Sequence, residues 1–434
     1  MVVTIVVLLI LAGVSISLLL DENGIIKKSK DARREYGQAK ANEQEDLSNL
    51  SDMIDEATGK VAKINVNTKA SKNGTINGEA GDSNNPTIPK GYIPIDTATS
   101  TWGDGSTAPS QDSVNHGLVI KDEKNNEWVW VPVDSTTLAT MYEESSDEKT
   151  LCGTTGETAV KTRLYSKSIT IGTDSNKETI SRATPGTSDK YREPDLVVKN
   201  PAGNDDYDTK TEYYNTILGF DSKEKMAEAF VVDYNEMIAS IDQYGGFYIG
   251  RYELSEAGVQ KDKATLTNTN WYNLYKKCKE LNASDKVEAR MIWGCQWDVT
   301  MNWLISSGAK TSNEVNTDSS SWGNFYYTSV KADDGKTELK ASGTMEKLNT
   351  GKTTFTMANN IYDLAGNCFE WTQEAGGAGA RAGRGGNYGG NGSSHPASCR
   401  NIGYGPDHSG DSRRFSSHFN NKVTLDSERL ILTV

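Results

Sequence analysis

The first twenty residues of the chain, 1–20, carry no charged side chain. As a helix, twenty residues rise about 30 Å, which is the hydrocarbon thickness of a bilayer. A cleavable signal peptide would need a basic region before the apolar run and a small-residue cleavage site after it. The sequence shows neither before the polar switch at Asp21. The run therefore predicts a helix that anchors the protein in a membrane.

Two segments of different polarity follow the apolar run. Residues 21–58 are polar with a thin apolar stripe at Leu47, Leu50 and Ile54, which is the spacing of an exposed amphipathic helix. Residues 59–90 are rich in Asn, Gly, Thr and Lys and nearly lack large apolar side chains, which is typical of a linker. We therefore expect a stem helix followed by a linker.

The apolar VVTIVVLLILAGVSISLL, the break DENGII and the polar stem resemble the N-terminal stem of type IV pilin-like proteins (prepilins) of Gram-positive bacteria. The resemblance implies a head outside the cell and pilus or pseudopilus subunits as partners. The family's basic leader ending in Gly and its usual early Glu do not occur here, so a simple membrane anchor remains the alternative. Five basic residues between Lys27 and Arg34 would, by the positive-inside tendency alone, leave the head in the cytoplasm. The pilin resemblance favours the opposite orientation, with the head on the bacterial cell surface.

Charge and cysteine spacing disfavour several classes of function. The chain of 434 residues has 46 Lys and Arg against 59 Asp and Glu, a formal net charge of −13. Non-specific nucleic-acid binding needs a basic surface, so we expect no nucleic acid as a partner. The five cysteines lie far apart without a CxxC pair, which disfavours zinc modules and disulfide scaffolds.

The head, residues 91–434, combines strand and helix signals with long polar loops, so we expect an α+β fold. Alternating apolar residues between turn signals predict strands, and apolar residues three and four apart predict helices. The expected strands cover 92–95, 117–120, 127–133, 247–253 and the final ERLILTV, and the expected helices cover about 222–240, 271–281 and 295–306. Residues 134–213 are polar with few periodic signals, so we expect them to form an insertion on the surface.

Four segments of the head occur in an order that resembles a known family. They are GGFYIGRYELS, WYNLYKKCKEL, RMIWGCQWDVTMNWL, and IYDLAGNCFEWT followed by RGGNY. They resemble the formylglycine-generating enzyme/sulfatase-modifying-factor family, a branch of the C-type-lectin-like folds. The resemblance covers residues 245–434 and weakly reaches back to Tyr92. It implies a single lectin-like domain with a small twisted sheet, packed helices and long functional loops, carried on the N-terminal hydrophobic helix.

The segment YDLAGNCFEW predicts a Gly-Asn turn followed by a strand. The carboxylates of Asp363 and Glu370 and the carbonyl oxygens of Gly366 and Cys368 are hard oxygen ligands of the kind that calcium takes. The family resemblance suggests a calcium site at this place. The alternative is an Asx-turn beside a hydrogen-bonded surface glutamate.

Catalysis of the family's type is not expected. Its oxygen-dependent enzymes hold copper with two neighbouring cysteine thiolates in the C-terminal loop. Here the loop contains only Cys399, with Ser394 five residues before it, so we expect no copper. Another branch uses histidine-ligated iron, and His395, His408 and His418 lack the helical spacing that would hold it. The lone cysteine is then a loop residue or half of a disulfide.

Residues 384–421 contain no Lys, Glu, Gln, Met or Trp, although all five occur elsewhere in the chain. Gly, Ser, Asn, Tyr, Arg, His and Asp dominate, a composition close to that of antibody paratopes. The segment also resembles the variable region of proteins that retroelements diversify on a lectin-like scaffold. Substituting adenines in Asn codons yields Gly, Ser, Asp, His, Tyr and Arg, but none of the five missing types. A loop that merely avoids long side chains is the alternative.

We therefore expect a surface-displayed protein that binds an extracellular glycan, protein or phage. The expected ligand-binding residues are Asn387, Tyr388, Asn391, His395, Asn401, Tyr404, Asp407, His408, Asp411 and Arg413. All except Asn387 are expected to face solvent on one surface. Arg384, Gly385 and Gly386 are expected to be structural, and Arg400 a buried anchor. A minor pilin whose head only decorates a filament and a membrane-anchored enzyme of the formylglycine-generating type are the alternatives.

Overall fold

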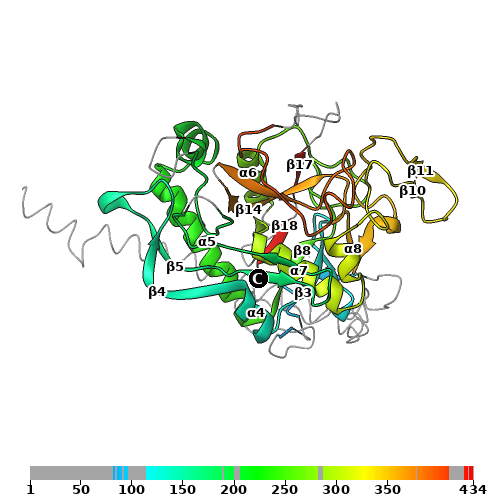
Figure 1. The fold of residues 1–434 in the computed structure, drawn as a ribbon, viewed down its shortest axis with the longest axis horizontal. Helices are drawn as coiled ribbons and strands as arrows, with labels where there is room; N and C mark the ends of the chain where they lie inside the picture. Colours follow the sequence, from blue (N-terminus) through cyan, green and yellow to red (C-terminus); the bar gives the residue numbers. More distant parts are fainter. Residues whose placement is uncertain are drawn as a thin grey trace, which may run out of the picture. The chain divides into compact units, whose positions relative to one another are not determined.

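The computed structural model describes much of the head (Figure 1). The described residues are 82–83, 86–89, 92–95, 114–187, 190–199, 206–281, 287–377, 379–409, 425–428 and 430–433. Helices and small, mainly antiparallel sheets alternate along this part of the chain, so the fold is α+β, as the sequence predicted.

The elements of the described part of the chain are mostly short, and three helices and two strands are longer than seven residues. The helices are α4 (Ser135–Met141), α5 (Lys223–Tyr244), α6 (Trp271–Glu280), α7 (Gly294–Ser306) and α8 (Ser312–Asn316), with the short turns η1 (Gly156–Thr158), η2 (Tyr207–Thr209), η3 (Glu212–Ile217) and η4 (Thr354–Thr356). The strands are β1 (Ile93–Pro94), β2 (Val119–Lys121), β3 (Glu127–Pro132), β4 (Tyr142–Thr150), β5 (Lys161–Ser166), β6 (Ile169–Ile171), β7 (Glu178–Ile180), β8 (Gly246–Gly250), β9 (Glu288–Met291), β10 (Val330–Lys331), β11 (Glu338–Lys340), β12 (Met357–Ala358), β13 (Ile361–Tyr362), β14 (Phe369–Gly376), β15 (Ala380–Arg384), β16 (Arg400–Asn401), β17 (Leu425–Glu428) and β18 (Leu430–Thr433).

The largest sheet has six antiparallel strands in the order β1-β2-β3-β8-β18-β9. In β3, the run EWVWVP buries Trp128, Val129, Trp130 and Val131 together, so the strand has apolar neighbours on both faces. Such a continuous apolar run is typical of a strand covered on both sides. Strand β18, close to the end of the sequence, lies between β8 and β9 and completes this sheet.

A second sheet, with the order β16-β15-β14-β17, carries the C-terminal segment. All eight residues of β14 are buried, and its pairing with β15 is interrupted by a bulge between Trp371 and Ala375. Helix α7 contacts both β14 and β3 and thereby joins the two sheets. Helix α5 packs on β8, and α6 packs on β9.

The helix ends follow ordinary capping chemistry. Helix α5 begins after Ser222, whose Oγ accepts a hydrogen bond from the Lys225 backbone N–H at 3.2 Å. It ends at Gly245, which has φ 72°, a backbone conformation that glycine adopts without steric cost. Helix α6 begins after Asn270 in the same way.

Most sequence-predicted elements of the head are confirmed. The helices predicted over 222–240, 271–281 and 295–306 are α5, α6 and α7, and the strand predicted in ERLILTV is β18. The strand predicted over 247–253 is β8, which ends earlier, at Gly250. The Arg251 N–H still donates to the Glu127 carbonyl of β3 at 2.9 Å, but the Arg251 carbonyl accepts from the Tyr362 N–H of β13, at 2.9 Å, and not from a strand of the six-stranded sheet.

The expectation that residues 134–213 lie on the surface is corrected by the structure. The segment forms α4, the hairpins β4–β5 and β6–β7, and η2, and β5 packs against α5 (Figure 1). Several of its charged side chains are fully or almost fully buried: Arg182, Arg192, Glu193, Asp195 and Asp208. The segment is therefore packed into the head through buried polar contacts, which a hydrophobic periodicity does not reveal.

The predicted apolar helix (1–20) and stem (21–58) lie outside the described residues, as does most of the predicted linker (59–90). Within the described part of the chain, every helix is too short or too polar to cross a bilayer.

Candidate ligand-binding loop and the charge cluster at its base

Residues 385–399 of the C-terminal loop lie between two arginines that face each other. Strand β15 ends at Arg384 and β16 begins at Arg400, and the two residues are partners in the antiparallel register. Their side chains are 0% and 2% exposed. The base of the loop therefore places two permanent positive charges next to each other in the protein interior, an arrangement that needs negative partners.

Asp298 on α7 and Glu374 on β14 supply the negative charge. Arg384 donates from Nη2 to Asp298 Oδ1 at 2.9 Å, and Arg400 donates from Nε to Glu374 Oε2 at 3.0 Å. Arg400 Nη2 also donates to Asp298 Oδ2. Both carboxylates are fully buried. The carboxylates of one residue on α7 and one on β14 thus pair with the arginines on either side of residues 385–399.

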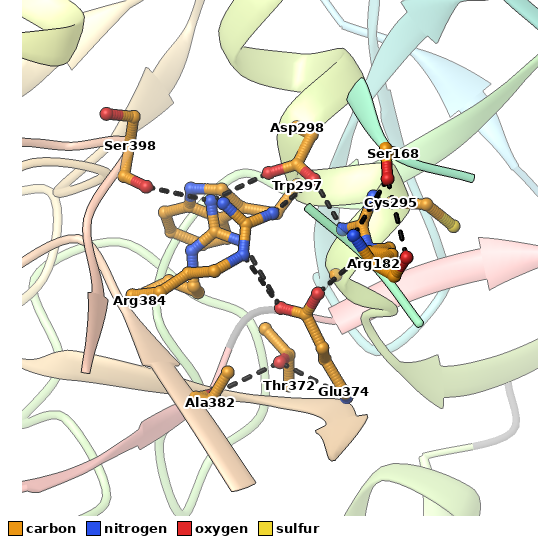
Figure 2. A network of polar contacts seen from close by, with 12 residues as sticks. Ser168, Arg182, Cys295, Trp297, Asp298, Thr372, Glu374, Ala382, Arg384 and Ser398 are labelled. Atoms are coloured by element: carbon orange, nitrogen blue, oxygen red, sulfur yellow. Dashed lines mark hydrogen bonds and ion pairs between the residues drawn. The ribbon is translucent and has the colours of Figure 1, made fainter. Parts of the chain in front are cut away.

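A third arginine reaches the same two carboxylates from the segment 134–213. Arg182 donates from Nε to Glu374 Oε1 at 2.9 Å and from Nη2 to Asp298 Oδ2 at 2.5 Å. Figure 2 shows Arg182 and Arg384 on opposite sides of the two carboxylates. We call these five residues, Arg182, Asp298, Glu374, Arg384 and Arg400, the charge cluster.

Electrostatics keep the charge cluster ionised. Burial alone would raise the pKa of Asp298, but Arg400, Arg182 and Arg384 outweigh it and hold that pKa well below its usual range. The pKa of Glu374 is also lowered, because the same arginines outweigh its burial. Guanidinium groups do not lose their protons in proteins. The cluster therefore does not titrate in the physiological range.

A third carboxylate, Glu193, lies at the edge of the charge cluster. Its oxygens accept hydrogen bonds from the backbone N–H groups of Gly294 and Cys295, at 2.8 and 2.7 Å, at the start of α7. Burial raises its pKa to about 7, although Arg182, 3.6 Å away, opposes this shift. Glu193 therefore links the N-terminus of α7 to the arginine that comes from the segment 134–213.

Backbone contacts fix the returning half of the loop. Trp297 Nε1 on α7 donates to the Ala397 carbonyl at 3.0 Å, and the Ala397 N–H donates to Ser319 Oγ at 2.9 Å. The Arg384 side chain also donates to the carbonyls of Ser398 and Cys399. The loop is thus held by its own first residue as well as by α7.

Gly385 and Gly386 are structural, as predicted. Their φ values are 84° and 80°, in the left-handed region that favours glycine. A Cβ on Gly385 would lie 2.6 Å from Glu370 Oε2, and one on Gly386 would lie 2.6 Å from the Phe325 ring. Both positions therefore require the absence of a side chain.

The predicted ligand-binding residues differ in exposure. Asp407 is exposed, and Asn387, at 1%, is buried. Six are half-buried: Tyr388, Asn391, His395, Asn401, Tyr404 and His408. Asp411 and Arg413 lie outside the described residues. The loop thus presents polar and aromatic side chains to solvent, but Asn387 lies beneath them.

The loop's two halves border different segments of the head. In the first half, the Gly390 carbonyl accepts a hydrogen bond from the Tyr326 N–H at 2.9 Å. In the second half, Ile402 lies against Gly376 beside Tyr191. The predicted residues therefore fall into two groups along the loop, and each group has neighbours that do not belong to the loop.

Sequence reasoning missed the tyrosines that border the loop. Tyr326 lies beside its first half, and Tyr191 and Tyr207 lie beside its second half, where Tyr207 packs against Gly405. The only sign in the sequence was an excess of tyrosine, with 19 Tyr against 8 Phe. An excess in composition does not say which tyrosines come together.

The residues predicted to bind calcium make protein contacts of their own. Asp363 Oδ2 accepts hydrogen bonds from Thr350 Oγ1, at 2.9 Å, and from the Gly351 N–H, at 2.8 Å. Glu370 is fully buried, so the alternative that made it a surface residue is wrong. Across the described ranges, no group of three or more His, Cys, Asp or Glu side chains is placed to hold a metal ion. Calcium at Asp363, Gly366, Cys368 and Glu370 stays a prediction from the resemblance.

Glu253 organises the turn before β14 and was not singled out from the sequence. It is fully buried, and it accepts hydrogen bonds from Asn367 Nδ2 at 2.6 Å, Thr265 Oγ1 at 2.6 Å and the Cys368 N–H at 3.1 Å. Asn367 itself has φ 57°, in the predicted Gly-Asn turn. The polar side chains here support the backbone.

All five cysteines are free thiols in the structure, so of the two alternatives for Cys399 the structure supports the loop residue and not half of a disulfide. Burial raises the pKa of the Cys399 thiol to about 12, although Arg384 opposes this shift. The thiol is therefore protonated at neutral pH and is a poor nucleophile or metal ligand in this state.

Comparisons with protein-family models, with curated proteins and with solved structures found no match to this chain. The two family resemblances therefore rest on the sequence segments that carry them. The function is inferred from the loop and its base.

Proposed function

We propose that this chain is a surface-displayed ligand-binding protein of the adhesion or receptor type. In this proposal, residues 384–421 form a variable binding face on a C-type-lectin-like head related to the formylglycine-generating enzymes. A pilin-like stem carries the head outside the cell. The observation that supports it best is the base of the loop, where buried Arg384 and Arg400 share the carboxylates of Asp298 and Glu374.

The loop combines a base held by buried contacts with polar side chains at its tip, as a binding face requires. The charge cluster and Trp297 hold the loop without using the side chains of Tyr388, Asn391 or Asp407. Asp407 is exposed and Tyr388 and Asn391 are half-buried, so changes at these positions should affect folding less than changes in the buried base. A loop held in one conformation also loses less entropy when it binds.

The same division supports diversification by a retroelement. Positions at the base carry the buried contacts, whereas Asn391 and Asn401 are half-exposed. Changes at adenines would therefore alter the surface more than the core. Sequencing the genomic neighbourhood tests this part: we expect a reverse transcriptase gene and a near-copy of the DNA that encodes residues 384–421. A locus without either contradicts diversification and leaves ligand binding to be judged by binding data.

Binding is tested with three probes: an oligosaccharide array, extracted bacterial surface proteins and intact phage particles. We expect the full chain in detergent to bind at least one probe. The triple variant Tyr388→Ala, Asn391→Ala, Asp407→Ala should lose that binding and keep a cooperative thermal transition, because none of the three side chains belongs to the buried base of the loop. A triple variant that binds as tightly as the parent contradicts the proposal.

Location is tested with a reporter fused after Val434. Alkaline phosphatase is active only outside the cytoplasm, so we expect activity in intact cells. Deleting residues 1–20 should release the reporter from the membrane fraction. If a reporter that works only in the cytoplasm is active when fused after Val434, surface display is contradicted.

A further inference from the structure

The first half of the loop lies against residues 319–328, which we call the support segment. The Ser319 N–H donates a hydrogen bond to the Gly392 carbonyl at 3.2 Å, and the Tyr326 N–H donates to the Gly390 carbonyl at 2.9 Å. Both bonds use the backbone of the loop, so they do not depend on the side chains that the loop carries. The support segment therefore acts on the path of the loop and not on the identity of its residues.

The support segment contains a tight turn, residues 325–328, close to the start of the loop. The Thr328 N–H donates to the Phe325 carbonyl at 3.0 Å, which closes the turn. The Phe325 ring lies so close to Gly386 that a Cβ on this glycine would be 2.6 Å from it. The position of the turn therefore constrains the first residues of the loop after β15.

Lys340, the last residue of β11, holds this turn. Its Nζ donates to the Phe325 carbonyl at 2.7 Å and to the Thr328 carbonyl at 2.8 Å. These carbonyls belong to the first and the last residue of the turn, so one amine group joins its two ends. The Gly343 N–H, shortly after β11, adds a hydrogen bond to the Tyr326 carbonyl at 2.7 Å.

The Lys340 side chain is 1% exposed, and both of its hydrogen bonds go to this turn. Burying an amine is costly, and a methionine of similar length would avoid that cost. What the lysine contributes is therefore the pair of hydrogen bonds. Burial lowers the pKa of Lys340, although Glu346 and Glu338 oppose this shift. A neutral amine still donates two hydrogen bonds, so the turn is held in either protonation state.

The second half of the loop has a separate support. There the Trp271 N–H at the start of α6 donates to the Pro406 carbonyl at 3.1 Å, and Tyr207 packs against Gly405. Neither contact involves the support segment or β11. A change at Lys340 should therefore reach the first half of the loop alone.

We propose that Lys340 is a positioning residue for the binding loop: through the turn 325–328 it fixes the backbone of residues 386–397, the first half of the loop, and so directs their side chains toward a ligand. This proposal rests on the proposed function, because it concerns the same loop. It adds a determinant of binding that lies on β11 and touches no ligand.

Hydrogen exchange on the full chain in detergent, read by mass spectrometry, compares the parent with Lys340→Met. We expect exchange in residues 386–397 and in the support segment to become about fivefold faster or more, since an ordinary hydrogen bond contributes roughly this factor to an equilibrium. Exchange in residues 401–409 and in β3 should stay within about twofold of the parent. A substitution that only weakened the whole fold would speed exchange in all of these regions alike.

Lys347→Met is the matched control, because Lys347 is a half-buried lysine that braces a different part of the chain. Its Nζ donates to the Thr265 carbonyl and to Thr267 Oγ1, both at 3.0 Å. This variant should leave exchange in residues 386–397 unchanged. Lys340→Gln keeps a polar side chain that is one bond shorter, so we expect it to reach at most one of the two carbonyls. It keeps the test valid if Lys340→Met does not fold.

Unchanged exchange in residues 386–397 of the Lys340 variants overturns the positioning role, as does equal acceleration in residues 401–409. The oligosaccharide array, the surface proteins and the phage particles supply the binding arm. Lys340→Met should bind about fivefold more weakly than the parent to any probe that the parent binds, and Lys347→Met should bind as the parent does. Faster exchange with unchanged binding overturns the contribution to binding.

The failures of the two proposals differ. A parent chain that binds none of the three probes contradicts the proposed function, whereas the exchange pattern still decides whether Lys340 positions the loop. A parent that binds a probe through the loop, with exchange in residues 386–397 unaffected by Lys340→Met, supports the proposed function and overturns the role of Lys340.

Discussion

At the scale of single residues, substitutions in the buried charge cluster are expected to destabilise the protein most. Removing two charges from water costs several kcal/mol per ion, and their attraction offsets this cost only when every partner is present. In the cluster, Asp298 and Glu374 each contact more than one arginine. The loss of one arginine therefore leaves buried carboxylates short of a partner.

Arg182→Leu tests this dependence. We expect the free energy of unfolding to fall by about 3–5 kcal/mol, because breaking a buried ion pair leaves an uncompensated charge. Urea unfolding followed by tryptophan fluorescence measures the change. Arg163→Leu is the control: Arg163 is 59% exposed and lies 3.9 Å from Glu148, so its loss should cost less than about 1 kcal/mol. Equal losses in the two variants would contradict a buried cluster that stabilises the fold.

Gly385→Ala tests the close approach at the start of the loop. Both Gly385 and Gly156 have positive φ, at 84° and 67°, but a Cβ on Gly156 would meet no atom within 4 Å. Gly156→Ala therefore measures the backbone strain alone, about 1 kcal/mol. Gly385→Ala should cost clearly more, because its Cβ would lie 2.6 Å from Glu370 Oε2. Thermal melting compares the two variants, and equal melting temperatures would show that Glu370 can move aside.

At the scale of elements, the loop carries two histidines with lowered pKa values. Burial lowers the pKa of His395 and of His408, although Asp407 partly opposes the shift at His408. In the unfolded chain a histidine titrates near 6.5. The unfolded loop therefore binds more protons than the folded loop once the pH falls below about 6.5, and folding of the loop weakens with falling pH.

Hydrogen exchange of residues 385–409 measures this weakening. Between pH 7.5 and pH 5.5 we expect protection in the loop to fall, after correction for the intrinsic exchange rate, while β3 stays protected. The double variant His395→Gln, His408→Gln should lose most of the pH dependence. A double variant with the parent's pH dependence would assign the effect to other groups.

The elements with a regular apolar pattern could be predicted from the sequence, whereas the polar elements could not. Helices α5, α6 and α7 have apolar residues at helical spacing, and β3 has an unbroken apolar run. All four elements were therefore predicted. Strand β4, YEESSDEKT, is largely exposed and lacks that pattern. Its pairing with β5 is what makes it a strand, and pairing is a contact between distant residues.

For the site, the sequence indicated which residues are buried at the base but not their partners. Arg384 was predicted to be structural and Arg400 to be a buried anchor, and both side chains are buried. Nothing in the sequence connected them to Arg182, which lies about 200 residues earlier in the chain. A salt bridge between distant segments has no local signature, since it depends on how the sheets and helices come together.

At the scale of the whole molecule, the segment 134–213 is part of the head's interior. Besides Arg182, it supplies Asp208, which pairs with Arg381 and accepts a hydrogen bond from the Tyr272 hydroxyl at 2.7 Å. Arg192 pairs with Asp195 within the segment at 2.7 Å, and its backbone pairs with Ala375 of β14. The head therefore folds as one unit with this segment.

Excising residues 134–213 and joining the ends with a short Gly-Ser linker tests whether the head needs this segment to fold. We expect no cooperative thermal transition, because buried Arg381 would lose Asp208, and Asp298 and Glu374 would each lose Arg182. Circular dichroism at rising temperature is the measurement. Replacing the exposed β10–β11 turn, residues 332–337, by Asn-Gly is the control and should leave a cooperative transition. A cooperative transition after the excision would make the segment an independent appendage.

The position of β18 has a consequence for synthesis. This strand lies between β8 and β9, so the largest sheet is incomplete until Leu430–Thr433 has left the ribosome. The proposed variable segment, 384–421, is translated just before it. A stop codon or frameshift introduced into the segment removes the strand that joins β8 to β9, so such a chain has no complete sheet. Only chains translated through the loop in the correct frame contain β18 and can complete the sheet. Completion of the sheet therefore selects against versions of the loop that carry a stop codon or a frameshift.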